Sequence, residues 1–100
     1  MAKAFELKVG TYTGTGAALT SGINEIGFKP QLVIAFNQTD GDVAWFHING
    51  QTAATAVSLD TEVAVETNAC TLSATGFSLG TNTVVNENAK VYVYAAIGGN

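Results

Sequence analysis

The chain has 100 residues and a mass of 10.3 kDa, a size at which a single hydrophobic core is the most that folding can support. Hydrophobic residues make up 47% of it and charged residues only 12%, a composition that excludes an intrinsically disordered chain. The net charge of -4 makes it a poor partner for the phosphates of nucleic acid. We therefore expect one folded domain over residues 1–100 that binds no nucleic acid.

The chain lacks the usual features of small exported domains. Its single cysteine, Cys70, cannot form an internal disulfide, which indicates synthesis in a reducing compartment. Glu6 stands where the apolar core of a signal peptide would begin, and no run approaches the roughly 18 apolar residues of a membrane span. We expect no export signal and no membrane partner, and we expect oligomerisation to supply the stability that disulfides give to other small domains.

Short runs rich in Val, Ile, Thr and aromatic residues alternate with turn residues about every eight to twelve positions, which is typical of an all-β protein. Residues 5–9 alternate apolar and charged side chains and predict a strand with one face on a core and the other in water. Residues 23–28 predict a short strand or extended segment, which Pro30 ends. Residues 32–36 are apolar on both faces and predict a central strand covered on both sides.

The second half of the pattern completes a β-rich domain. Asp40 and Gly41 are a turn signal, so residues 43–48 form a hairpin with residues 32–36. No window has the apolar spacing of a helix, and any helix is therefore a single turn. Further strands are predicted at residues 52–59, 62–66 (half-buried), 71–74, 77–79 and 90–97. Together these elements predict a single-domain antiparallel β-sandwich or a jelly-roll-like barrel.

Candidate catalytic and metal-ligating residues are sparse. His47 is the only histidine, Cys70 has no cationic neighbour in the sequence, and no nucleophile motif accompanies either residue. One cysteine and one histidine cannot supply the ligands of a zinc site. The acidic clusters at residues 40–42 and 60–62 are explained by turn formation better than by a calcium site. We predict no catalytic residue, no metal and no cofactor, and hence no enzyme.

Aromatic residues are the candidates for contacts with partners. The high apolar fraction and the low charge predict that part of the apolar set is buried between subunits. Phe5, Trp45, Tyr92 and Tyr94 lie in predicted strands, and large aromatic residues are frequent in interfaces. We predict subunit contacts at these four residues. As an alternative, Trp45, Tyr92 and Tyr94 form a platform on which a sugar stacks.

Several segments occur in a recognisable order. The most specific is Gly-Phe-x-Pro-x-x-Val-Ile at residues 27–34, followed by Gly-Phe-x-x-Gly at residues 76–80 and by Val85-Asn86 leading to the tyrosine strand at residues 91–97. The other segments are residues 10–16, Asn37 and residues 39–42. Over nearly the whole chain, this series resembles a group of small β-rich virion proteins of tailed phages.

The resemblance implies a non-enzymatic structural protein of a phage virion, assembled in the cytoplasm of the bacterial host. The first expectation is a decoration, or cement, protein on the outer surface of the head. Its partners are then the major capsid protein or neighbouring virion proteins, and further copies of itself in a symmetric trimer. The alternative is a tail or spike-base module that binds host carbohydrate. The matching segments carry no catalytic or ligand-binding residue.

Overall fold

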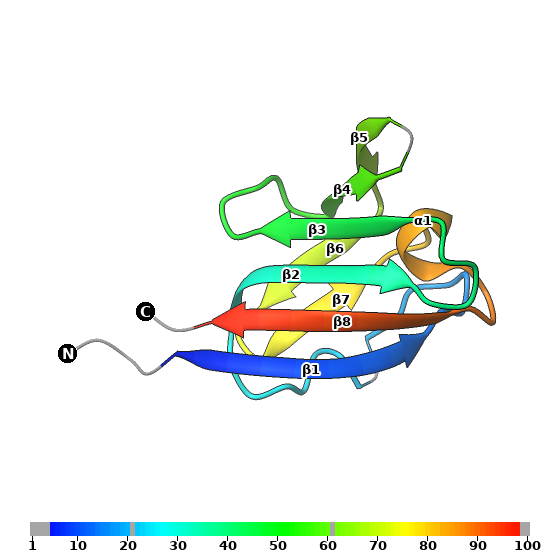
Figure 1. Cartoon of the computed structure of the whole chain (residues 1–100). Coiled ribbons are helices and arrows are strands. Elements are labelled where there is room, and N and C mark those ends of the chain that lie inside the picture. The colour runs from blue at the N-terminus through cyan, green and yellow to red at the C-terminus, as the bar shows by residue number, and fades with distance from the viewer. Residues whose placement is uncertain (1–4, 21, 61, 99–100) are drawn as a thin grey trace.

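Strands dominate the computed structural model, which describes residues 5–20, 22–60 and 62–98 (Figure 1). The single described helix is one turn long, as predicted, and the described residues include no helix of the length and apolarity that a membrane crossing requires. In chain order the elements are β1 (Glu6–Thr13), β2 (Pro30–Asn37), β3 (Ala44–Ile48), β4 (Thr55–Leu59), β5 (Val63–Thr67), β6 (Cys70–Ser73), β7 (Gly76–Leu79), α1 (Thr83–Asn86) and β8 (Val91–Gly98).

The strands form two antiparallel sheets of unequal size. Six of them lie in the order β1-β8-β2-β3-β4-β5, and β6 and β7 form a separate hairpin. The hairpin and α1 lie on one side of the large sheet (Figure 1). The large sheet is open, because β1 and β5 at its two ends do not pair with each other in the described chain. The fold is therefore the predicted all-β sandwich and not the jelly-roll-like barrel.

One predicted strand is absent. Residues 23–28 form turns, although Ile23 is buried in the core. The Phe77 N–H donates to the Ile23 carbonyl oxygen at 3.0 Å, and the Ile26 N–H donates to the Thr75 oxygen at 2.9 Å. A Cβ atom at Gly76 would lie only 2.3 Å from the Ile23 oxygen. The segment therefore packs beside β7 through individual hydrogen bonds and does not form a further strand. This close approach requires a glycine at position 76.

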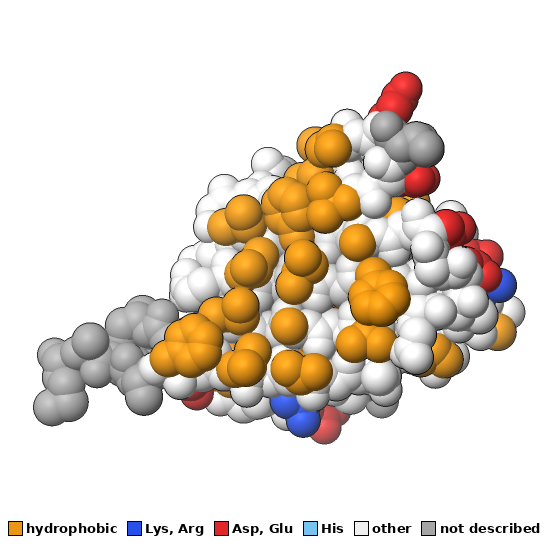
Figure 2. Space-filling model, viewed as in Figure 1, with side chains coloured by type: hydrophobic (Ala, Val, Ile, Leu, Met, Phe, Trp, Pro, Cys, Tyr) orange, Lys and Arg blue, Asp and Glu red, His pale blue; other side chains and the backbone are white. Residues whose placement is uncertain are grey.

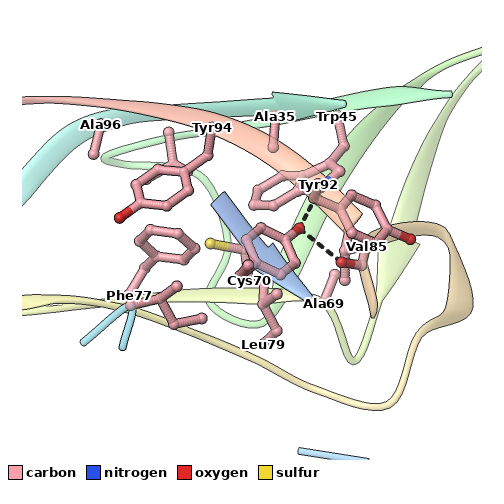
Figure 3. Packing of buried hydrophobic residues seen from close by; sticks show 14 residues of the cluster. Ala35, Trp45, Ala69, Cys70, Phe77, Leu79, Val85, Tyr92, Tyr94 and Ala96 are labelled. Carbon is pink, nitrogen blue, oxygen red and sulfur yellow. Dashed lines mark hydrogen bonds between the residues drawn. The ribbon is translucent and has the colours of Figure 1, made fainter. Parts of the chain in front are cut away.

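The core fills the space between the large sheet and the β6–β7 hairpin (Figure 3). Trp45 and Tyr94 point from the large sheet towards Phe77 on the hairpin (Figure 3). The Phe77 ring meets both at a steep angle, with centroid distances of 6.4 Å to Trp45 and 5.3 Å to Tyr94. Edge-to-face contacts of this kind stabilise aromatic cores beyond the effect of area alone.

A buried hydroxyl group joins three elements of the fold. The Tyr12 hydroxyl of β1 donates to the backbone oxygen of Val85 in α1 at 2.8 Å and accepts from the indole N–H of Trp45 in β3 at 3.2 Å. The Tyr12 ring also stacks on Tyr92 of β8, with a centroid distance of 4.8 Å and an interplanar angle of 4°. Burial raises the pKa of Tyr12, which keeps the hydroxyl protonated and able to donate.

A buried amide holds the loop after β1. Asn86, at the end of α1, donates from Nδ2 to the backbone oxygens of Ala17 at 2.6 Å and Gly80 at 2.9 Å. Its Oδ1 accepts from the backbone N–H of Thr15 at 2.8 Å. Both polar atoms of this fully buried side chain are satisfied, so the amide contributes to stability.

Replacing Tyr12 with Phe should lower the free energy of unfolding by about 2 kcal/mol, because the Val85 oxygen and the Trp45 N–H would both lose a buried partner. Urea unfolding followed by tryptophan fluorescence measures the change. The matched control is Tyr94→Phe, since the Tyr94 hydroxyl has no hydrogen-bond partner in the described part of the chain. Equal losses for the two variants would contradict the structural role given to the Tyr12 hydroxyl.

Candidate functional site

In the described part of the chain, no second layer lies on the side of the large sheet turned away from β6, β7 and α1, and apolar side chains are spread across that side (Figure 2). We call this side the outer face. Its large exposed residues are Phe5, Leu7, Val9, Ile34, Phe36, Ile48, Leu59, Val63, Val65 and Val91. Between these lie the half-buried Leu32, Ala44, Phe46, Val57, Val93, Ala95 and Ile97. No described strand position on this side carries a charged side chain.

The strand register aligns these side chains in rows across the sheet. The central row runs from β1 to β5 through Val9, Ala95, Ile34, Phe46, Val57 and Val65. A neighbouring row runs through Thr11, Val93, Phe36, Ala44, Leu59 and Val63. Cross-strand neighbours of this kind pack against one another and hold the register of a sheet. The outer face is therefore one continuous apolar surface over six strands.

In β1 the usual relation between apolar pattern and burial is reversed. Leu7 and Val9 lie on the outer face and are 55% and 61% exposed, and Phe5, immediately before the strand, is 71% exposed. Glu6 and Lys8 point to the side that carries the core, where Glu6 is half-buried and Lys8 is exposed. The strand and its two-residue period are as predicted. The prediction that its apolar side meets a core is wrong for this chain, because the small layer covers the other side of the sheet.

β2 and β5 show the same uncovered apolar positions. β2 is central, as predicted, and its Val33 is buried in the core. The prediction that β2 is covered on both sides is wrong, because Ile34 and Phe36 are 40% and 44% exposed on the outer face. β5 is an edge strand and not the predicted half-buried one, with Val63 and Val65 both about 70% exposed.

The outer face is slightly hollowed near its centre. A shallow depression of about 290 Å³ lies where β1, β8, β2 and β3 meet. Its lining contains no charged side chain and includes the small Ala95 and Ala44 beside the larger Val9, Ile34 and Phe36. Ligand pockets are usually larger and more enclosed and contain a few oriented polar groups, so this hollow has the character of an interface more than of a small-molecule site.

The structure separates the four predicted contact residues. Phe5 is exposed immediately before β1, next to the outer face. Trp45, Tyr92 and Tyr94 are 0%, 0% and 3% exposed, because their parity along β3 and β8 directs them into the core. The predicted subunit contacts are therefore wrong for these three side chains. The stacking platform for a sugar is wrong for the same reason.

The polar candidates have structural partners. His47 is buried beside the core, and its Nδ1 donates to the backbone oxygen of Thr55 at 2.6 Å. The Asp40 carboxylate accepts from the Lys90 ammonium group at 3.0 Å and from the Asn37 side-chain amide at 3.2 Å. The backbone N–H of Asp40 donates to Asn37 Oδ1 at 3.0 Å. These contacts close the β2–β3 turn and connect it to the start of β8, as expected for turn chemistry.

Metal-binding and nucleophilic chemistry find no support in these residues. Among the described residues, His, Cys, Asp and Glu side chains do not gather in groups of three or more. The candidate cluster at residues 60–62 includes Thr61, which lies outside the described residues. Cys70 is buried, and this burial raises the pKa of its thiol from 9.0 to about 12. A thiol in this environment stays protonated at neutral pH and is a poor nucleophile.

Comparison with models of protein families, with curated proteins and with solved structures finds no match to this chain. The site is thus defined by its own geometry: a charge-free sheet face that the fold leaves uncovered.

Reasoning from the sequence missed most of this site. It selected aromatic residues, three of which the fold buries. It overlooked the aliphatic residues that the strands direct to the outer face, such as Ile34, Val63 and Val65. Two features of the sequence together point to an uncovered apolar face. Residues 32–36 are apolar on both sides of the strand, and 100 residues are too few to cover both sides of a large sheet.

The raised pKa of Cys70 predicts a loss of stability at alkaline pH. The folded thiol keeps its proton to about pH 12, whereas the unfolded thiol releases it above its ordinary value of 9.0. This contribution is fully present below pH 9.0 and falls as the pH rises towards 12. Between about pH 8 and about pH 10.5, we expect unfolding free energy to fall by about 2 kcal/mol more in the unmodified chain than in Cys70→Ala.

Urea titrations of both proteins under reducing conditions at several pH values provide this comparison. Because Cys70→Ala also leaves a small cavity, the readout is the difference in pH dependence and not the stability at one pH. Parallel pH profiles for the two proteins would show that the thiol does not titrate as inferred.

Proposed function

We propose that the protein is a non-enzymatic subunit of a larger assembly, which it joins through the outer face. The observation that carries the proposal is the continuous, charge-free apolar surface over six strands. The largest apolar patch on a monomeric protein is usually about 300 to 600 Å², and larger ones mark interaction sites. An assembly partner that covers the outer face removes this surface from water, at roughly 25 cal/mol for each Å² buried.

The arrangement of the core supports a structural role. Of the candidate catalytic groups, His47 and Cys70 are buried, and the Asp40 carboxylate is engaged in closing a turn. The rows of the outer face instead come from six hydrogen-bonded strands, and a sheet is a rigid platform for binding. Function in this protein then resides in a surface and its fixed shape.

For the biological setting, we propose a decoration protein on the head of a tailed phage. Support comes from the order of sequence segments that begins with Gly-Phe-x-Pro-x-x-Val-Ile at residues 27–34. A decoration protein binds only the assembled shell, so it stabilises that state by mass action. Among the described strands, the edge strands β1 and β5 each have a neighbour on one side only, and such edges can add to the strands of a shell protein. No observation favours the carbohydrate-binding alternative, because its proposed aromatic platform is buried.

The test is to purify tailed-phage particles from cultures that produce this chain and to image them by cryo-electron microscopy, with a labelled antibody to locate it. We expect density for the protein in many symmetric copies on the outer head surface. Density on the tail alone would reject the decoration role. Absence from purified particles would reject the virion setting as a whole.

A further inference from the structure

We propose that a second copy of the chain covers the outer face, so that two large sheets pack face to face about a twofold axis. This inference rests on the proposed role as an assembly subunit and identifies the partner that binds the outer face. The support comes from the area, the charge and the shape of the outer face.

The exposed area is sufficient for a stable dimer. The ten large residues of the outer face are between 37% and 71% exposed. If a fully exposed side chain of this size presents roughly 150 to 200 Å², together they expose on the order of 900 Å². A typical stable interface takes about 800 Å² from each partner. The apolar area exposed on the outer face of one copy is therefore large enough to form a stable interface with a second copy.

The charge distribution favours a copy over an unlike partner. The chain has a net charge of -4, so two copies would repel if their acidic groups met. The outer face avoids this, because Glu6, Lys8 and Glu66 lie on the opposite parity of their strands. Specific contacts between unlike proteins usually rely on complementary charges, and the outer face has none to offer. Asp42 borders the outer face next to Phe36 and Leu59, where it can remain hydrated at the rim.

The shape of the outer face allows two copies to interlock. Two twisted sheets of the same hand stack with strand directions about 30° apart and side chains interdigitating over about 10 Å. The hollow of about 290 Å³ lies at the junction of β1, β8, β2 and β3, and Phe36, which lines one side of it, is 44% exposed. A twofold axis near this point would place Phe36 of each copy against the hollow of the other. Such isologous contact closes after two copies and leaves β1 and β5 available to a shell.

Sedimentation equilibrium of the full chain, over a concentration range from about 1 to about 100 μM, is the experiment. We expect a species of twice 10.3 kDa that dissociates on dilution. Because the outer face is uncharged, raising sodium chloride from about 0.05 to about 1 M should weaken the dimer by less than about threefold. A monomer throughout, a trimer, or a dimer that salt dissociates would overturn the proposal.

Lysine substitutions locate the interface. Ile34→Lys at the centre of the outer face and Val65→Lys on β5 should each raise the dissociation constant by at least about 30-fold, since they bury an unpaired charge. Val65 is the safer site for folding because it is already 68% exposed. The matched control is Ala74→Lys, which adds the same charge at an exposed position after β6 in the small layer. Circular dichroism confirms that each variant folds. A folded Val65→Lys protein that dimerises as tightly as the control would overturn the assignment.

The assembly proposal and this inference fail in different experiments. If the chain is found on phage heads but sediments as a monomer, the outer face binds a shell protein and the inference is wrong. If the chain dimerises through the outer face but is absent from particles, the inference stands and the proposed setting fails.

Discussion

The whole molecule depends on the two-residue period of its strands and on apolar residues at both parities of that period. One parity supplies Trp45, Tyr92 and Tyr94 to the core, and the other supplies Ile34, Phe36 and their neighbours in rows. Within the described residues, the second layer consists of one hairpin and one helical turn. That layer can cover one side of a six-stranded sheet, and so half of the apolar pattern is left without a partner inside the chain.

The covered side is held by directional contacts in addition to burial. The Tyr12 hydroxyl joins β1, β3 and α1, and the Asn86 amide joins the loop after β1 to the end of β7. Buried polar groups of this kind select one arrangement among several apolar packings, because any other would leave them unsatisfied. The outer face has no comparable groups on its apolar rows. The difference explains how a small layer can define which side of the sheet becomes the core.

Much of the fold could be predicted from the sequence, because turn residues and two-residue alternation report local geometry. The strands at residues 32–36 and 90–97, the hairpin after Asp40 and the all-β class all follow from such signals. Which side of each strand the second layer covers is a non-local property, and local patterns do not contain it. For that reason the local pattern of β1 predicts a core against its apolar side, and the aromatic character of Trp45 predicts an interface contact. In the fold the core lies against the other side of β1 and contains Trp45. The turns at residues 23–28 likewise depend on their contact with β7.

The position of β8 has a consequence for the order of events during synthesis. β8 lies between β1 and β2 in the sheet, yet the ribosome makes it after β1 to β7. Until residues 91–98 have emerged, β1 has no neighbour in the sheet and the rows that cross β8 are interrupted. Nascent chains on one messenger therefore cannot present the finished binding surface to each other. Because of this topology, the outer faces of two chains can bind each other only after β8 has been translated. This limits premature association of nascent chains on the polysome.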